Sequence, residues 1–323
     1  DLLYFGGIGT YVKAADERHA DAGDRANDAL RVDGREIRAK VIAEGANLGM
    51  TQRGRVEYAR VGAGGKGGRL NTDAIDNSAG VDCSDHEVNI KILFSQPVGE
   101  GKLSLAARDA LLAEMTDEVA ALVLRDNYLQ TACLSVTNAI APATLDRQWR
   151  FMKALEKAGR LDRAVEFLPD DVELADRFAR GVAFTRPELA VLLAYAKLTL
   201  YEELIDSPVP DDPYLGRELG RYFPREVTER YPDALEHHRL RREIIATQLA
   251  NSMINRGGPS LIVRIADQTG ADAARIAAAF AAVRDSYEMP ELNDEVNALD
   301  NKVKGAVQLS LYAAIEDLLL DRL

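Results

Sequence analysis

The stretch that decides the fold begins with AKVIAEGANLGMTQ (Ala39–Gln52). Its first six residues predict a buried strand, because the short apolar run from Val41 to Ala43 ends just before a glycine, as parallel strands covered on both faces do. The turn after this strand, Gly45-Ala46-Asn47, combines two small residues with an amide side chain. Backbone and a planar donor and acceptor can therefore approach a ligand closely at this turn.

The stretch continues with GGRLNTDAIDNSAGVDCSDHEVNIKILF (Gly67–Phe94), which repeats the arrangement. Residues 68–71 predict a second short strand, residues 76–80 predict a small polar turn, and the residues from Val81 onward predict a helix. The side chains of this helix that are expected to face a core are Val88, Ile92 and Leu93.

Two consecutive strands thus each end in a turn that carries an asparagine. Because ligands of open α/β sheets bind outside the carboxyl ends of the strands, Asn47 and Asn77 are candidates for one site. Ser84 lies about one turn into the following helix and is a third candidate. The residues alone leave an alternative open, since Asn, Ser and Gly in turns often serve backbone geometry only.

Two motifs of this stretch resemble a known group of enzymes. EGAN after a strand, followed by NSAGVxxS at the start of a helix, resembles the amino acid dehydrogenases, and NTDAIDNSAGVDCSDHEVNIKIL is similar to the large bacterial NAD-specific glutamate dehydrogenases. The resemblance covers essentially the whole chain, through DLLYFGGIGTYVKA at its start and TRPELAVLLAYAK and LRREIIATQLANSMINRGG later. The chain departs from the smaller dehydrogenases at Ser78, Asp82 and Asp85.

The resemblance implies roles for individual residues. It implies that Asn47, in the turn with Gly45 and Ala46, lies by the nicotinamide ribose of bound NAD. It implies that Asn77 and Ser84 lie by the substrate amino acid. Gly6 and Gly7, which follow the apolar strand Leu2–Phe5, would form a tight turn that lines the cofactor cleft. The plain alternative for these two glycines is a turn that needs a positive φ.

Two glycine-rich segments suggest other interpretations, which we reject. Gly7-Ile8-Gly9 is no dinucleotide fingerprint, because its third glycine would fall on Val12 and no acidic strand end follows at the right distance. Residues 62–68 are no phosphate loop, because neither Ser nor Thr follows Lys66. They resemble the loop that holds the substrate carboxylate in the smaller glutamate dehydrogenases, but that loop lies far upstream in another domain. We expect an exposed connection here.

The composition predicts an ordinary globular protein. A chain of 323 residues with 47% hydrophobic and 28% charged residues holds a sizeable core, and two domains are expected. The resemblance, together with the helical pattern from about residue 100, implies the C-terminal half of an NAD-binding, Rossmann-like α/β domain at residues 1–98 and an all-helical domain at residues 99–323.

Charge and cysteine content narrow the partners and the compartment. The formal charge of −12 disfavours nucleic acid or an anionic membrane surface as the main partner. Cys83 and Cys133 are too few for a disulfide framework, and the sequence has neither a signal-peptide pattern nor an apolar run of membrane-spanning length. We therefore expect a cytoplasmic protein, and the resemblance implies a small-molecule substrate.

From about residue 100 the pattern is helical only. Thr185-Arg186-Pro187-Glu188 predicts a capping box that starts an apolar helix over residues 189–205, expected at the centre of the second domain. Residues 291–323 predict one last helix with a coiled-coil-like seam, which packs within the bundle or against another subunit. We expect the full-length protein to be a homo-oligomer.

His86 stands beside Asp85 and near Glu87 on the helix that follows the second turn. A histidine among carboxylates can act as a base or as a metal ligand. Because no third ligand follows at helical spacing, the sequence favours a structural or cofactor-lining histidine, and no metal site is predicted.

Hydride transfer between NAD and an amino acid requires more than these residues. It needs a glycine-rich turn for the pyrophosphate, a proton-transferring base and a cation for the substrate carboxylate. We find no fingerprint and no convincing Lys–Asp pair. The resemblance implies that both lie upstream, in a larger protein from which a chain starting at Asp1 looks cut.

The predicted function is therefore a share in an NAD-dependent glutamate dehydrogenase, which interconverts L-glutamate with 2-oxoglutarate and ammonia. The chain alone is predicted to be inactive. Two alternatives stay open at this point: a helical oligomerisation or regulatory module without catalysis, and a dehydrogenase of another amino acid such as leucine or valine.

Overall fold

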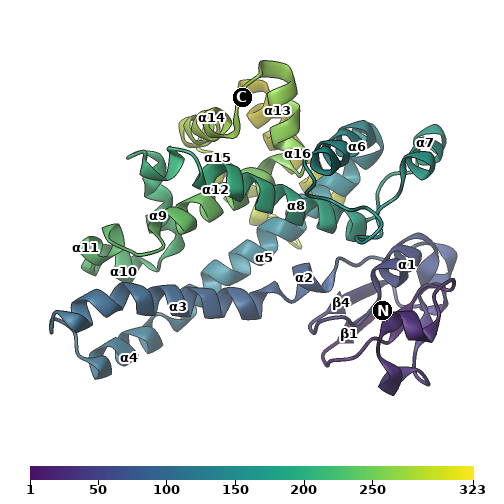
Figure 1. Ribbon diagram of the computed structural model, residues 1–323, viewed down its shortest axis with the longest axis horizontal. Coiled ribbons are helices and arrows are strands. Elements are labelled where there is room, and N and C mark those ends of the chain that lie inside the picture. The colour runs from purple at the N-terminus through teal and green to yellow at the C-terminus, as the bar shows by residue number, and fades with distance from the viewer. The chain divides into compact units, whose positions relative to one another are not determined.

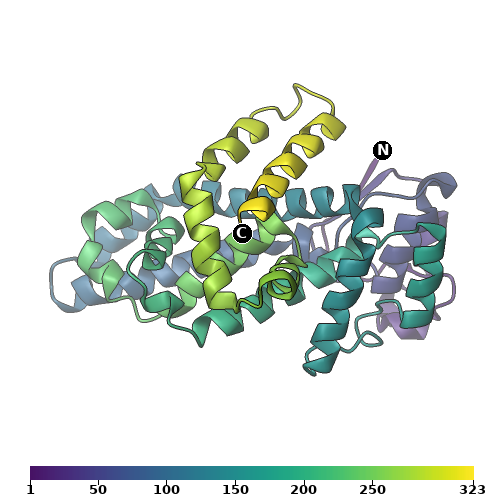
Figure 2. The same cartoon turned by 90° about the horizontal axis from the view of Figure 1, so that it is seen from above.

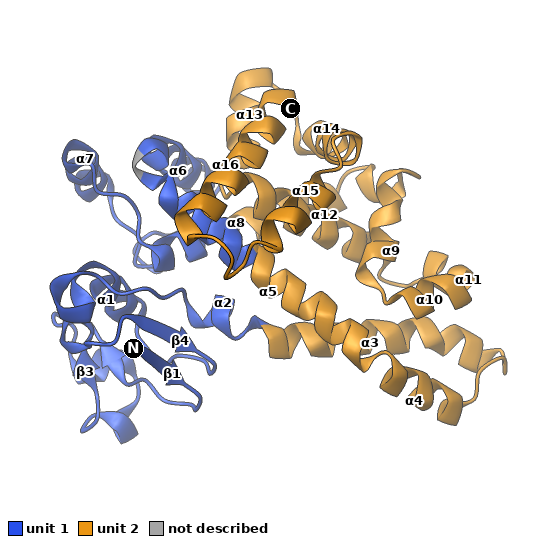
Figure 3. Ribbon diagram, turned by 180° about the vertical axis from the view of Figure 1, so that it is seen from behind, with its two compact units in different colours: residues 1–78, 130–195 blue, residues 79–129, 196–323 orange. Residues whose placement is uncertain are grey.

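The computed structural model describes residues 1–141 and 143–323, and the chain divides into two compact units. The first unit comprises residues 1–78 and 130–195, and the second comprises residues 79–129 and 196–323 (Figure 3). Each unit is thus built from two separate segments of the chain. The domain boundary placed after residue 98 does not coincide with these units and stays a prediction.

The strands of the first unit form two small parallel pairs. β1 (Leu2–Phe5) pairs with β4 (Val41–Glu44) in parallel, with Leu2 opposite Val41 and Phe5 opposite Glu44 (Figure 1). β2 (Val12–Lys13) pairs in parallel with β3 (Val32–Asp33). The two strands predicted from the apolar runs before Gly6 and Gly45 are confirmed, but the predicted burial is wrong: β1 is largely exposed, with Tyr4 63% exposed, and Val41 of β4 is 37% exposed.

A small core holds these strands against helix α1 (Gln52–Gly65). The helix begins after Thr51, whose side chain accepts a hydrogen bond from the backbone N–H of Gly54 and so caps the first turn. Tyr58 is fully buried on this helix, and its hydroxyl donates to the carbonyl of Ala39 at 2.8 Å. The buried members of this core are Val12, Ile37, Ile42, Met50, Tyr58 and Leu70.

Helices make up most of the remaining chain. Three helices contain residues of both units: α3 (Ser78–Gly99), α5 (Thr116–Ala139) and α8 (Arg186–Ile205). The other helices of the first unit are the 3₁₀ turns η1 (His19–Ala22), η2 (Arg25–Asn27) and η3 (Gly34–Glu36) and the α-helices α2 (Asp73–Asp76), α6 (Ala141–Lys157) and α7 (Asp171–Arg180).

The described residues of the second unit form helices and connecting segments and no strand. Its further helices are α4 (Leu105–Glu114), η4 (Val209–Asp211), η5 (Leu215–Arg217), α9 (Glu218–Tyr222), α10 (Arg225–Arg230), α11 (Pro232–Glu236), α12 (Arg241–Gly257), α13 (Leu261–Thr269), α14 (Ala273–Ser286), α15 (Met289–Asn297) and α16 (Gly305–Arg322).

Helix α12 is the central element of this unit and contacts α9, α14 and α16. Its buried face includes Ile245, Leu249 and Met253, which are fully enclosed and recur at intervals of four residues. The last two helices, α15 and α16, run side by side (Figure 2).

Several expectations about the motif stretch are corrected. Residues 68–71 form no strand; Arg69 makes a single parallel bridge with Val41, and its carbonyl accepts from Ile42. The predicted polar turn at residues 76–80 is narrower, because α2 and α3 are separated by Asn77 alone. The predicted helix after it is confirmed as α3, but Val88 is 54% exposed, and Ile90 and Phe94 face the core with Leu93 instead.

Two expectations about the helical half are also wrong in detail. The last helix is broken into α15 and α16, since residues 298–304 form turns in which Asn301 has a positive φ of 60°. The helix started by Thr185 lies not at the centre of one domain but across both units. Its capping is confirmed, because the Glu188 carboxylate accepts from the backbone N–H of Thr185 at 2.7 Å.

The observed class is thus a largely helical protein with a few short parallel strands. Among the described residues, no helix combines the length and the apolar character that crossing a bilayer requires.

Candidate functional site

The candidate site lies where β1 and β4 end side by side. The turn after β4 starts at Gly45, whose backbone N–H donates to the carbonyl of Phe5 at 2.9 Å. A Cβ at Gly45 would lie 1.9 Å from the hydroxyl of Tyr4, so a glycine lets the tyrosine ring fold over this turn. Gly6 and Gly7, after β1, are exposed beside it, so both strands end in accessible backbone.

The structure brings two of the three predicted ligand residues together. Asn77 donates a hydrogen bond from its side-chain Nδ2 to the side-chain Oδ1 of Asn47, at 2.6 Å. Asn47 is exposed and Asn77 is half-buried. The two asparagine turns, which are far apart in sequence, therefore form one polar surface at the carboxyl end of β4.

A buried ion pair lies beneath the first of these turns. Glu44, the last residue of β4, accepts two hydrogen bonds from Arg55 on α1, at 2.7 Å from Nε and 2.8 Å from Nη2. Arg55 also pairs with Asp73 at 3.0 Å, and Asp73 accepts from the backbone N–H of Leu48 at 2.8 Å. Leu48 has a φ of 60°, so this bond holds a strained residue directly after Asn47.

A second network lies beneath Asn77. The Asp76 carboxylate accepts from the backbone N–H of Glu44 at 3.1 Å and from the side chain of Asn71 at 2.8 Å. Arg186, at the start of α8, donates to the Asn71 side-chain oxygen at 2.7 and 3.1 Å. These side chains therefore link the two turns to β4, α1 and α8. They contact the turns from the inner side, and the opposite side of the turns stays exposed to solvent.

Burial shifts the pKa values of these groups. It raises the pKa of Glu44 above its usual range, although Arg55 acts in the opposite direction. Burial alone would lower the pKa of Arg55, but the hydrogen bonds and charge of Glu44 raise it. Burial likewise raises the pKa of Asp76, against its bond from Asn71. Carboxylates with raised pKa values are common at sites that transfer protons.

The other predicted residues lie elsewhere in the structure. Ser84 is exposed on α3 in the second unit, where its hydroxyl donates to the carbonyl of Val81 at 2.7 Å, and its place beside the asparagines stays a prediction. Lys66 is exposed at the end of α1, as expected for a surface connection. His86 is 1% exposed on α3, and its Nε2 lies 3.8 Å from an oxygen of Asp82, one turn earlier on the same helix.

Sequence reasoning missed the supporting residues Glu44, Arg55, Asp73, Asn71 and Arg186. The only local signal was a glutamate that ends an otherwise apolar strand. A buried carboxylate needs a cationic partner, and nothing in the spacing shows which arginine provides it.

The surface formed by Asn47 and Asn77 can bind a polar ligand. Each side-chain amide offers both donors and an acceptor, which suits the hydroxyl groups of a ribose and the charged groups of an amino acid. The exposed backbone at Gly6 and Gly7 adds further donors and acceptors at the same edge.

Comparison with known proteins places the chain among dehydrogenases. Residues 1–137 match the family model described as "Bacterial NAD-glutamate dehydrogenase, catalytic domain", and residues 181–322 match the model "Glutamate dehydrogenase, C-terminal".

Individual relatives agree with the family models. The chain is 51% identical over 311 residues to the NAD-specific glutamate dehydrogenase of Halomonas elongata and to that of Pseudomonas aeruginosa, covering 96% of this chain and 19% of each relative. It is 47% identical over 270 residues to the NAD-specific glutamate dehydrogenase of Mycobacterium tuberculosis, covering 84% of this chain and 16% of the relative. The chain thus spans about a fifth of the length of the curated relatives it matches.

Proposed function

Since this chain belongs to the bacterial NAD-glutamate dehydrogenases, we propose that it forms one wall of the cofactor and substrate cleft of such an enzyme. The reaction would convert L-glutamate, NAD and water into 2-oxoglutarate, ammonia and NADH. The observation that carries the proposal is the hydrogen bond between Asn77 and Asn47 at the end of β4. It joins the turn proposed to bind cofactor to the turn proposed to bind substrate.

We propose that Gly45, Ala46 and Asn47 lie along the nicotinamide ribose, with Gly6 and Gly7 lining the cleft beside them. The residues fit such a group: Asn47 is exposed, and a Cβ at Gly7 would meet no atom within 4 Å. NAD, when bound, supplies the hydride acceptor. On this proposal β1 and β4 are two strands from the C-terminal half of a Rossmann-like domain over residues 1–98, followed by a helical domain.

We propose that Asn77 and Ser84 hold the substrate amino acid. The Asn77 amide, turned by its bond to Asn47, keeps one N–H and its oxygen for the ligand. The Ser84 hydroxyl is exposed on α3 and its oxygen can accept a further hydrogen bond. The catalytic base and the cation for the substrate carboxylate would come from the larger remainder of a full-length enzyme.

The experiment uses a full-length enzyme that carries this sequence. Asn47→Ala is expected to raise KM for NAD, and Ser84→Ala to raise KM for glutamate, each by about tenfold, the loss of one ligand hydrogen bond. Asn138→Ala, which removes an exposed amide from α5, is the control. If both site variants keep the KM values of that control, the proposed roles are wrong.

The 323-residue chain alone is expected to be inactive. Steady, glutamate-dependent formation of NADH by the purified chain would contradict the proposal that the catalytic base lies outside it.

We further propose that the full-length enzyme is a cytoplasmic homo-oligomer. The support for the compartment is that both cysteines are free thiols: Cys83 is exposed and Cys133 is buried. The mass of the native enzyme measured by light scattering tests the assembly, and a monomer would contradict it.

A further inference from the structure

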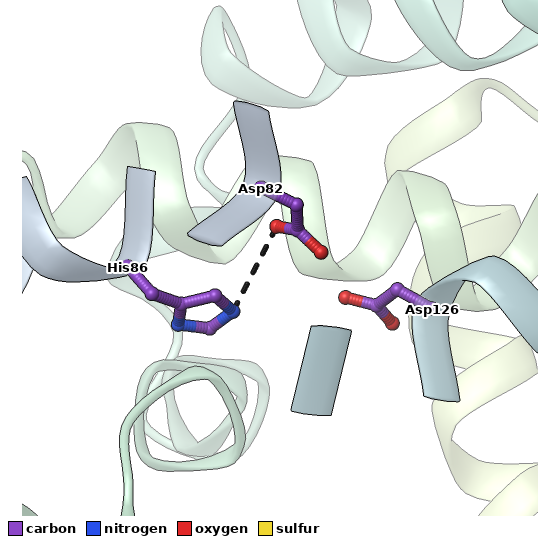
Figure 4. A group of neighbouring side chains, drawn as sticks. All are labelled: Asp82, His86 and Asp126. Atoms are coloured by element: carbon purple, nitrogen blue, oxygen red, sulfur yellow. Dashed lines mark ion pairs between the residues drawn. The ribbon is translucent and has the colours of Figure 1, made fainter. Parts of the chain in front are cut away.

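Three ligand-type side chains of the second unit converge between α3 and α5. Asp82 and His86 lie one turn apart on α3, so they share one face of the helix. Asp126 lies on α5 opposite them. One oxygen of each aspartate and one ring nitrogen of His86 lie within 4.8 Å of one another, and the three side chains point toward a common centre (Figure 4).

His86 is an unpartnered polar side chain at this centre. It is 1% exposed, and neither of its ring nitrogens has a hydrogen-bond partner among the described residues. Its Nε2 lies 3.8 Å from the nearer Asp82 oxygen, which is too far for a hydrogen bond. A buried imidazole without partners is costly, so the arrangement needs a further group to be satisfied.

The orientation of the imidazole is fixed by its neighbours. The ring of Tyr222 stacks on it, with 4.2 Å between the ring centroids and 14° between the planes. Tyr222 is itself held, because its hydroxyl accepts from the Asn89 side chain at 2.8 Å. Burial lowers the pKa of His86, which favours the neutral imidazole that binds metal ions.

Two carboxylates, those of Asp82 and Asp126, lie at the same place. Burial and then the charges of Asp126 and Asp85 raise the pKa of Asp82 to about 6. Burial also raises the pKa of Asp126, while Lys197, Arg125 and Arg256 act in the opposite direction, and Lys197 also opposes the raised pKa of Asp82. A divalent cation that both carboxylates bind would compete with these side-chain cations for them.

The centre is open to a cavity. His86 and Asp126 form part of the wall of a cavity of about 400 Å³, whose other charged side chains are Arg125, Arg221, Arg256, Arg284, Glu218 and Glu291. The cavity gives an ion a way in and leaves room for water molecules in its coordination shell.

We propose that Asp82, His86 and Asp126 bind one divalent transition-metal ion of the Zn²⁺ or Mn²⁺ kind. An imidazole nitrogen with two carboxylates suits these ions, whereas Mg²⁺ and Ca²⁺ prefer oxygen ligands only. The ion would cross-link α3 to α5 and fix the segment of α3 between Asp82 and His86. The proposal is independent of the dehydrogenase proposal.

The test is metal binding measured by isothermal titration calorimetry. The untagged chain is stripped of metal with EDTA, freed of EDTA, and titrated with ZnCl₂ and, separately, with MnCl₂. We expect one site per chain. His86→Gln and Asp126→Asn should each weaken binding at least tenfold, in line with the loss of a ligand. The matched controls are His237→Gln, an exposed histidine of the same unit, and Asp117→Asn, an exposed aspartate of the same helix α5, and both should bind as the unmodified chain does.

Two further measurements do not depend on the folding of these variants. Lys197→Met removes a side-chain cation that competes with the metal ion for the carboxylates of Asp82 and Asp126, and it should tighten metal binding. Pulsed electron paramagnetic resonance of the Mn²⁺-loaded, unmodified chain should show coupling to one histidine nitrogen. No saturable binding of either metal, equal binding by His86→Gln, or Mn²⁺ bound without nitrogen coupling would each overturn the proposal.

Discussion

The side-chain amide of Asn77 donates to the side-chain oxygen of Asn47 over 2.6 Å, and this bond joins two turns that 29 intervening residues separate along the chain. Neither asparagine completes a helix or a sheet by this contact. Beneath them, Glu44, Arg55 and Asp76 hold the turns from inside the first unit. A polar pair that buried side chains hold on one side and that faces solvent on the other is the arrangement expected of a ligand site.

The support beneath Asn47 should dominate the stability of the first unit. Arg55→Met leaves the Glu44 carboxylate buried without a partner and is expected to lower the free energy of unfolding by about 3–5 kcal/mol. Urea denaturation of the chain measures this loss. The control is Arg53→Met on the same helix, where the pair with Asp16 is exposed, and its expected cost is below about 1 kcal/mol. Equal costs for the two variants would show that the buried pair has no special role.

Helix α1, which carries Arg55, packs against η3 through a glycine. A Cβ at Gly34 would lie 2.6 Å from the backbone oxygen of Gly54 and 3.0 Å from the backbone nitrogen of Tyr58. Because backbone cannot move aside cheaply, Gly34→Ala should destabilise the unit by about 1–3 kcal/mol. Gly305→Ala, at a helical position where a Cβ meets nothing, should be neutral or slightly stabilising in the same thermal unfolding assay. A neutral Gly34→Ala would refute the close packing.

Asp171 should make stability depend on acid pH. A hydrogen bond from Trp149, then those from Arg163 and Lys153, lower the pKa of Asp171 to about 2. A carboxyl group whose pKa is lower in the folded than in the unfolded state contributes stability above the unfolded pKa of about 4, and this is lost as the pH falls toward 2. The stability difference between the unmodified chain and Asp171→Asn should therefore narrow over that range.

Fluorescence of Trp149, the single tryptophan, follows urea unfolding across this pH range. The control Asp176→Asn lies on the same helix, where its partner is the exposed Arg180. A difference between the unmodified chain and Asp171→Asn that stays constant from pH 6 to pH 2 would contradict the assignment.

Local patterns were enough to predict β1, β4 and the turn at Asn47, but they wrongly predicted a strand over residues 68–71. Apolar runs that stop at Gly6 and Gly45 define β1 and β4, and the capping box at Thr185 defines the start of α8, because each depends on neighbouring residues only. The break between α15 and α16 was missed, since the apolar seam continues through it while Asn301 adopts a left-handed turn.

Contacts between distant segments could not be predicted in the same way. Helical spacing showed no third ligand for His86, because Asp126 comes from a different helix. Arg55 and Arg186 likewise reach the candidate site from α1 and α8, and many other arginines of the chain have similar surroundings in sequence. The tertiary packing, and not the local pattern, selects these partners.

The measurement that tests the central claim most directly is a double-mutant cycle on Asn47 and Asn77 in a full-length enzyme, read as kcat/KM for glutamate at one fixed NAD concentration below the KM for NAD. Each alanine variant should lower kcat/KM by about tenfold or more, and the double variant should lose less than the product of the two, because the residues act through one hydrogen bond. If both single variants retain the kcat/KM of the Asn138→Ala control, the paired asparagines are a structural contact only, and the cleft lies elsewhere.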